Sequence, residues 1–327
     1  MPQIPVGPEV HVAVRRGPPG APEEVPPPTV RKVSPRRIRW ARRRRAVARF
    51  WHQYRKSKMG MIGLVILLIF AGVAVFALFS NPAATNPALT TGQPRLHSPS
   101  LTYPLGTDNY GISVLTLVIQ GSKTSLLVGF VATVITMLIG TVVGIAAGYR
   151  SGVFDAAIMR VTDVFLVLPW LALAIVLAAI LGQNLTVIIM IIGLTSWPST
   201  ARLVRAQTLS VKEHLYVERS RALGASGWHT VTRHILPNVM PVILSNTILT
   251  VAIAILSESA LSFLGLGDPF SVTWGSTIDK AFSAAALTLG AWWWLIAPSA
   301  CIVLVVLAFT MCGFATDEIV NPRLRER

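Results

Sequence analysis

Long apolar runs are the feature that most constrains what this chain can fold into. Four segments of 20 to 26 residues contain no Asp, Glu, Lys or Arg: 59–80, 124–149, 238–257 and 291–315. A further 38 uncharged residues lie between Asp163 and Arg202, and the turn-like Leu181-Gly182-Gln183-Asn184 divides them. A helix needs about 20 apolar residues to cross the hydrocarbon core of a bilayer. The pattern therefore predicts an all-α membrane protein with six transmembrane helices.

The six predicted spans divide the chain into loops on alternating sides. The spans are 59–80, 124–149, 161–181, 185–206, 238–264 and 291–315. External loops are predicted at 81–123 and 265–290, and cytoplasmic segments at 207–237 and 316–327. Two spans fit into the stretch around Asp163 to Arg202 only if the third span starts near Val161, which puts Asp163 just inside it, and the fourth runs past Arg202.

The distribution of basic residues predicts the orientation of these spans. The net charge is +15 although only 13% of the residues are charged. With both termini in the cytoplasm, 26 of the 29 Lys and Arg residues fall on the cytoplasmic side, and Arg95, Lys123 and Lys280 on the other. Lys and Arg are retained on the cytoplasmic side of membrane proteins. Because the charge is not spread over a polar fold, a nucleic-acid-binding protein is not expected.

The N-terminal part holds much of this charge. Residues 1–35 contain 10 of the 22 prolines, and we predict a disordered cytoplasmic tail there. Residues 36–58 include Arg42-Arg43-Arg44-Arg45 and four aromatic residues, which predicts a basic interfacial segment in contact with membrane lipids. Two readings remain open: these charges attract anionic headgroups, or they only fix the orientation, and we favour the second.

Motifs for catalysis, cofactors and metals are not found. Gly121-Ser122-Lys123-Thr124 resembles the end of a P-loop, but it lacks the glycine before the lysine and follows no predicted strand. His229 and His234 are five residues apart, off the spacing that places two ligands on one helical face. We therefore predict a protein that is not an enzyme, has no metal site and binds no cofactor itself.

The cytoplasmic loop at 207–237 is the most informative segment. A helix is predicted from about Val211 to Leu223, ending at Gly224, because glycine tolerates the positive φ of a helix end. Ser226 is expected to cap a second helix that reaches Leu236. The residues alone leave two readings open, a loop tip inserted into a groove on a partner or an amphipathic connector.

The same loop resembles the EAA motif of bacterial ABC import permeases. Glu218, Gly224 and Leu236-Pro237 stand at the matching places. The chain departs from the pattern at Arg219-Ser220, where the motif has two alanines, and at His234, where it has isoleucine. These departures leave the glycine and the proline in place, so the bend of the motif is expected to be kept.

A wider resemblance, over about residues 56–323, is to the C-type permease subunit of dipeptide, oligopeptide and nickel importers. The segments that carry it are Pro104-Leu105-Gly106-Thr107-Asp108, Ser125-Leu126-Leu127-Val128-Gly129, Ala201-Arg202-Leu203-Val204-Arg205, Arg221-Ala222-Leu223-Gly224-Ala225-Ser226 and Leu261-Ser262-Phe263-Leu264-Gly265-Leu266-Gly267. The resemblance implies a type I ABC importer permease (MetI-like) fold in the bacterial cytoplasmic membrane. It also implies a second homologous permease, two ABC ATPase subunits or one fused pair that bind ATP and Mg²⁺, and an external substrate-binding protein.

The residues expected to couple this chain to an ATPase follow from that resemblance. They are Glu218, Arg221, Ala222, Leu223, Gly224, Ala225 and Ser226. The implied cargo is a peptide, a peptide-like compound or a chelated metal. Two other functions remain alternatives, a self-sufficient secondary transporter or channel and a membrane-anchored scaffold that acts through its basic tail.

Ionisable and aromatic residues within the spans are candidates for the translocation pathway. Glu258 is expected either to face a cavity and sense cationic cargo or, as we favour, to be hydrogen-bonded within the bundle or to the partner permease. Trp197 is the second candidate, and Trp197-Pro198 is predicted to interrupt the fourth span. For Asp163 we predict an ion pair with Arg160 one helical turn away.

Overall fold

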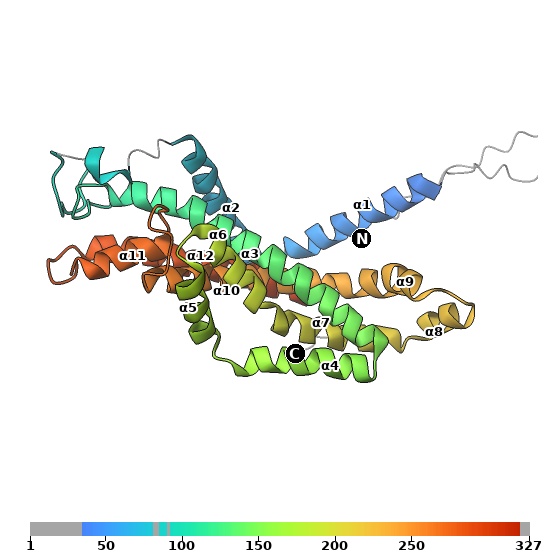
Figure 1. Cartoon of the computed structure of the whole chain (residues 1–327). Helices are drawn as coiled ribbons and strands as arrows, with labels where there is room; N and C mark the ends of the chain where they lie inside the picture. Colours follow the sequence, from blue (N-terminus) through green and yellow to red (C-terminus); the bar gives the residue numbers. More distant parts are fainter. Residues whose placement is uncertain (1–34, 81–84, 90–91, 321–327) are drawn as a thin grey trace, which may run out of the picture. The chain divides into compact units, whose positions relative to one another are not determined.

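The computed structural model describes residues 35–80, 85–89 and 92–320 (Figure 1). The chain forms two compact units, Met1–His52 and Gln53–Arg327. The disordered tail predicted at 1–35 and the end of the tail predicted at 316–327 lie almost wholly outside the described residues. The described residues form helices and no strand, with one isolated bridge between Thr107 and Ser113.

Helices account for nearly all of the described structure. In chain order they are α1 (Pro35–Tyr54), α2 (Lys58–Phe79), η2 (Pro87–Leu89), α3 (Val114–Arg150), α4 (Val153–Val167), α5 (Trp170–Leu181), α6 (Leu185–Thr195), α7 (Trp197–Lys212), α8 (Leu215–Ala222), α9 (Gly227–Thr230), η3 (Val231–Ile235), α10 (Leu236–Phe263), α11 (Trp274–Ser283) and α12 (Trp292–Val320). The prediction of an all-α fold is confirmed.

Five helical segments of the described chain are long and apolar enough to cross a membrane. They are Lys58–Phe79, Val114–Arg150, Leu185–Lys212, Gly227–Phe263 and Trp292–Val320. A sixth candidate is the pair α4 and α5, which passes the same test together but is bent by 87° between its helices. The bend falls at Leu168 and Pro169, where proline removes a backbone donor and holds the preceding residue in extended geometry. The third predicted span, 161–181, is therefore a broken helix pair.

Several helices extend beyond the predicted spans. The external loop predicted at 81–123 ends earlier than predicted, because α3 begins at Val114 and not at Thr124. At the other end of the bundle α7 continues to Lys212, and α12 continues to Val320. Charged residues ended the apolar runs in the sequence, but they do not break backbone hydrogen bonding, so the helices continue past the ends of the predicted spans.

The long helix α3 packs against α7 through three glycines spaced four residues apart. A Cβ atom at Gly144 would lie 2.6 Å from the carbonyl oxygen of Ala201, and one at Gly140 or Gly148 would lie within 2.8 Å of a side chain of α7. Such distances are shorter than real Cβ contacts, so only glycine permits this approach. A small residue at every fourth position is how membrane helices pack without large side chains between them.

Within Gln53–Arg327, α11 lies at one end of the bundle and α8 with α9 at the other (Figure 1). At the α11 end, the chain around Thr107 contacts α12. The indole nitrogen of Trp293 on α12 donates to the carbonyl oxygen of Thr107 at 3.2 Å. Asp108 accepts hydrogen bonds from the backbone of Tyr110 and Ile112, and burial raises the pKa of its carboxyl group. This end is therefore a packed, ordered part of the molecule.

Candidate functional site

The loop of residues 213–235, between α7 and α10, is the candidate site. It contains α8, a turn, α9 and the π-helical turn η3. The predicted helix from Val211 to Leu223 is wrong, because the chain turns at Glu213 and His214 between α7 and α8. At this turn the imidazole nitrogen Nδ1 of His214 lies 2.9 Å from the carbonyl oxygen of Ser210. The helix α8 is therefore separate from α7 and short.

The end of α8 has the geometry of a Schellman motif. Gly224 has φ of +85°, as predicted for the helix end. The backbone N–H of Ala225 donates to the carbonyl oxygen of Ser220, and that of Gly224 donates to the carbonyl oxygen of Arg221. These two bonds satisfy carbonyls that a helix terminus leaves free. The turn is thus defined by its own backbone, without help from another chain.

Ser226 begins the next helix, as predicted. Its hydroxyl oxygen accepts from the backbone N–H of His229 at 3.3 Å. The helix does not end near Leu236, however, because Gly227–Phe263 is one continuous span that contains Pro237. The π-helical turn η3 precedes this proline, and the Asn238 side-chain amide donates to the carbonyl oxygen of His234 at 2.6 Å. The π-helical turn lies where Pro237 has no N–H to donate to the carbonyl oxygen of Arg233.

Three fully buried residues attach the loop to the bundle, namely Val217 on α8, Thr230 on α9 and Ile235 on η3. Tyr149, near the end of α3, supports the turn from below, because a Cβ atom at Gly227 would lie 3.2 Å from its ring. The guanidinium carbon of Arg221 lies 5.9 Å from the centroid of the same ring. The loop is therefore a rigid projection from the helical bundle.

Large apolar side chains of the loop are exposed despite this rigidity. Leu223 is 88% exposed, Trp228 79% and Leu215 70%. Beside them lies a hollow of about 350 Å³, lined by Ser220, Leu223, Gly224, Ala225, Ser226 and His229. Exposed large apolar groups that a fold holds in fixed positions are typical of a protein-interaction surface.

The structure brings together only part of the predicted coupling set. Leu223, Gly224, Ala225 and Ser226 line the hollow, whereas Glu218, Arg221 and Ala222 are exposed on α8 outside it. Sequence reasoning missed Ser220 and His229 as lining residues and Leu215 and Trp228 as exposed apolar groups. Their exposure depends on how α8 and α9 fold back on each other, and no local pattern in the sequence signals it.

A row of rings along the loop was also missed. The ring centroids of His214 and Tyr216 are 5.5 Å apart, those of Tyr216 and His234 are 6.0 Å apart, and those of His234 and His229 are 6.0 Å apart. Tyr216 and His234 come from different helices, so the row holds the two halves of the loop together. No group of three His, Cys, Asp or Glu side chains among the described residues is placed to hold a metal ion.

Glu258 lies on α10 and is fully buried. Its carboxylate accepts hydrogen bonds from the hydroxyls of Ser262 at 2.7 Å, Ser125 at 3.1 Å and Ser259 at 3.4 Å. The Ser125 hydroxyl oxygen in turn accepts from the backbone N–H of Trp274, the first residue of α11. These residues form the Glu258 cluster, which joins α3, α10 and α11. The reading of Glu258 as hydrogen-bonded within the bundle is confirmed.

Trp197 lies elsewhere in the bundle, at the start of α7. It is half-buried, and its ring centroid is 5.6 Å from that of Phe165 on α4. The predicted interruption of the fourth span is present, since α6 ends at Thr195 and α7 begins at Trp197 with a proline in its first turn. The structure therefore does not bring Trp197 and Glu258 together in one site.

Two ion pairs hold α4 against α7. Arg205 makes a bidentate pair with Asp155, with both N···O distances at 2.6 Å, and Arg202 pairs with Asp163 at 2.6 Å. The predicted pair between Asp163 and Arg160 is wrong, because α7 lies beside α4 and presents Arg202 to that carboxylate. Some of the basic residues at this end of the bundle are thus paired with carboxylates.

Comparison with known proteins agrees with this architecture. Residues 140–326 match the family described as the binding-protein-dependent transport system inner membrane component. Residues 47–99 match the N-terminal transmembrane domain of oligopeptide transport permease C. The chain belongs to the family of binding-protein-dependent transport system inner membrane components.

Individual relatives are permeases of transport systems. The chain is 36% identical to the dipeptide transport system permease protein DppC of Bacillus subtilis over 277 residues, which cover 84% of this chain and 85% of that one. It is 31% identical to the glutathione transport system permease protein GsiD of Pectobacterium atrosepticum over 278 residues, 84% of this chain and 91% of that one. Both relatives are permease subunits of transport systems.

The fold is similar to that of a solved ABC importer permease. A chain of the methionine ABC transporter MetNI in an inward-facing conformation superposes with a TM-score of 0.51 and 20% identity. The match covers 63% of this chain and 95% of that one. The MetI-like fold implied by the sequence is confirmed, and the chain is a multi-pass inner-membrane component.

Proposed function

We propose that the chain is the permease subunit of an ATP-driven, binding-protein-dependent importer. It forms half of a translocation pathway with a second homologous permease. It couples to an ATPase subunit through the predicted 207–237 segment, whose part between α7 and α10 is the 213–235 loop. The observation that carries the proposal is the rigid loop that exposes Leu223 beside a hollow. An apolar projection held this firmly fits a socket on a partner.

The proposed partners follow from the family and from the loop. ATP and Mg²⁺ are bound by two ABC ATPase subunits, or by one fused pair, and this chain itself holds no cofactor. A binding protein outside the cell delivers the cargo. Both termini lie in the cytoplasm, which places 26 of the 29 Lys and Arg residues on that side.

The proposed cargo is a peptide or a peptide-like compound. The named relatives include permeases of dipeptide, oligopeptide and glutathione transport systems. They are 31% to 36% identical to this chain over 84% of its length. The choice among such cargoes belongs to the binding protein.

ATP-driven movement passes through the loop in this proposal. Closure of the ATPase dimer moves the loop as a rigid lever, because Val217 and Ile235 fix it to the bundle. Binding of ATP shifts the permease toward the outward-facing state only through tighter binding of the closed ATPase dimer to that state. The turn at Gly224 must therefore keep its shape for the two motions to stay linked.

The experiment replaces Gly224 with valine in the assembled transporter in proteoliposomes. A Cβ atom there meets nothing within 4 Å, but φ of +85° is unfavourable for a β-branched residue. We expect assembly and ATP hydrolysis to persist while uptake of labelled peptide falls at least ten-fold. Gly152→Val is the matched control, because Gly152 has φ of +74° and equally open surroundings between α3 and α4.

Two results would contradict the proposal. Uptake that stays unchanged in Gly224→Val, or falls equally in Gly152→Val, would remove the special role of the turn. Transport by the purified chain without any ATPase would favour the secondary-transporter alternative instead.

A further inference from the structure

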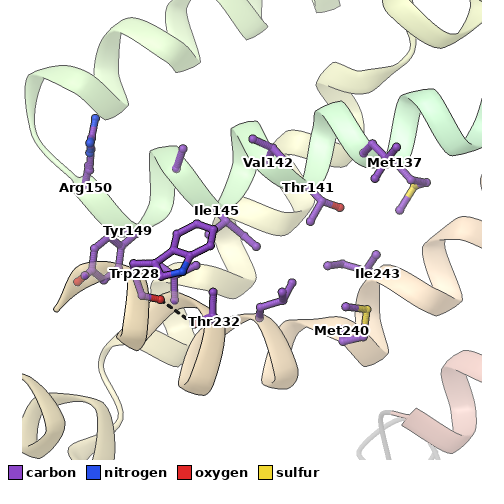
Figure 2. A pocket seen from close by; sticks show the side chains of 15 residues that line it. Met137, Thr141, Val142, Ile145, Tyr149, Arg150, Trp228, Thr232, Met240 and Ile243 are labelled. Atoms are coloured by element: carbon purple, nitrogen blue, oxygen red, sulfur yellow. Dashed lines mark hydrogen bonds between the residues drawn. The ribbon is translucent and has the colours of Figure 1, made fainter. Parts of the chain in front are cut away.

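An apolar groove runs along the inner half of α3, on the face that opens toward η3 and α10 (Figure 2). Its volume is about 850 Å³. Val142 and Ile145 of α3 line it together with Met240 and Ile243 of α10, and Ile145 points toward α10 in Figure 2. Val142 is 67% exposed, so the described chain leaves this part of the groove open. A large apolar face of this kind needs an occupant.

The dimensions of the groove match one leaflet of a bilayer. Its lining on α3 extends from Met137 to Arg150. At a rise of about 1.5 Å per residue this is about 20 Å. One leaflet of the hydrocarbon core is about 15 Å thick, and the remainder reaches the headgroup layer.

One end of the groove is polar and basic. Arg150, Tyr149 and Trp228 line it, and Trp228 is mostly exposed, as interfacial tryptophans are. Arg150 is exposed, its guanidinium carbon lies 4.9 Å from the ring centroid of Phe154, and no carboxylate among the described residues pairs with it. No Asp or Glu lines the groove. The charge at this end therefore favours an anion.

We propose that this groove binds an anionic phospholipid, with one acyl chain between α3 and α10 and the phosphate beside Arg150. Basic pockets between membrane helices are known to take such headgroups. A peptide fits less well, because its backbone would need hydrogen-bond partners and the lining offers few. The hydroxyl of Thr232, one of those few, already donates to the carbonyl oxygen of Trp228 at 2.8 Å.

The inference uses the proposed function only for orientation, namely that the α8 end of the bundle faces the cytoplasm. A bound lipid there would support the joint of α3, α9 and α10 from which the 213–235 loop projects. The site is separate from the hollow beside Gly224, since the two share no lining residue.

The test is photo-crosslinking with two probes that differ only in the headgroup. The full chain, alone and in its transporter complex, is placed in phosphatidylcholine nanodiscs that contain a trace of diazirine-labelled phosphatidylglycerol or diazirine-labelled phosphatidylcholine. Labelled peptides are identified by mass spectrometry. We expect the anionic probe to label peptides around Val142 and Met240 about five-fold more than the neutral probe, the effect of one basic residue near an anionic lipid.

Matched variants separate the headgroup from the acyl chain. Arg150→Gln should remove the preference for the anionic probe, whereas Arg160→Gln, at another exposed arginine outside the groove, should keep it. Val142→Trp should fill the groove and abolish labelling there, whereas Val303→Trp, on the exposed face of α12, should not.

Three outcomes would overturn the proposal. They are equal labelling by both probes, an unchanged preference in Arg150→Gln, and labelling that disappears when the complex assembles, which would make the groove an interface with the second permease. None of these readouts needs ATP or transport. A failed uptake experiment with Gly224→Val would therefore leave the lipid result intact, and the reverse also holds.

Discussion

The Glu258 cluster and the 213–235 loop are two ordered regions of one bundle that treat their side chains in opposite ways. The cluster buries a carboxylate and surrounds it with hydroxyl donors from its own chain. The loop fixes its backbone with a Schellman turn and then exposes leucine and tryptophan. Rigidity alone therefore does not show function. A rigid region whose polar groups are all hydrogen-bonded within the chain stabilises the fold. A rigid region that exposes large apolar side chains is suited to binding a partner.

This difference has an energetic basis. A buried polar group without partners is costly, so the three hydroxyls around Glu258 stabilise the folded protein. Exposed leucines cost little in the isolated chain and contribute binding energy when a partner covers them. The first region should thus respond to mutation with lost stability, and the second with lost assembly.

The largest effect on stability is expected where helices touch through glycine. Gly144→Leu places a side chain against the backbone of Ala201, where a Cβ atom alone would lie at 2.6 Å. Overpacking of a tight interface costs about 1–3 kcal/mol or more, and backbone cannot yield as side chains do. We expect no folded protein by size-exclusion chromatography in detergent. Gly72→Leu, where a Cβ atom meets nothing within 4 Å, should elute normally, and equal behaviour of both variants would refute the packing argument.

Removing the acceptor of the Glu258 cluster comes next. Glu258→Ala leaves Ser125, Ser259 and Ser262 without their acceptor, at about 1–3 kcal/mol for each unsatisfied group. We expect a total loss of about 3 kcal/mol, measured as the free energy of unfolding in mixed micelles. Glu258→Gln keeps one acceptor oxygen and should lose less than half as much.

Glu213→Ala supplies the control for that measurement, because Glu213 is an exposed carboxylate between α7 and α8. Surface substitutions of this kind change stability by no more than about 0.5 kcal/mol. If Glu258→Ala proved as mild as Glu213→Ala, the cluster would not be holding α3, α10 and α11 together.

The sequence was sufficient for the periodic features of the fold. Apolar runs indicated where the long apolar helices lie. A positive φ at Gly224 and a cap at Ser226 also followed, because turns and caps depend on the residues nearby. The departures arose where hydropathy was used to set helix ends. Lys123 ended an apolar run without ending the helix that contains it.

Contacts between distant segments could not be read from the sequence. Asp163 has Arg160 within a helical turn, yet it pairs with Arg202 because α7 lies alongside α4. The hollow beside Gly224 likewise requires His229 to fold back on α8. In both places a local preference of a few tenths of a kcal/mol competes with the packing of whole helices, and the packing decides.

The two ion pairs between α4 and α7 repeat the comparison on a smaller scale. The Asp155 and Arg205 pair is bidentate and mostly buried, whereas Asp163 and Arg202 are each about half exposed. We expect Asp155→Asn to cost about 2 kcal/mol, in the range of hydrogen bonds to charged groups. Asp163→Asn should cost at most about 1 kcal/mol, and less at high salt. Equal costs in thermal unfolding with and without salt would show that burial does not distinguish the pairs.

The smallest effect on stability is expected at Leu223, and it is the most informative about function. Leu223 is 88% exposed, so Leu223→Ser removes almost no packing within the chain and should change the free energy of unfolding by no more than about 0.5 kcal/mol.

In the proposed complex the same side chain is covered by an ATPase subunit, and losing a buried leucine at the centre of an interface costs about 2 kcal/mol or more. Co-purification of the ATPase should therefore fall by more than ten-fold while the melting temperature stays unchanged. Leu289→Ser, at a leucine between α11 and α12 that is 60% exposed, should alter neither quantity. A melting temperature lowered by Leu223→Ser would mean that the leucine packs within the chain and that the loop is a connector, which is the reading that the residues alone had left open.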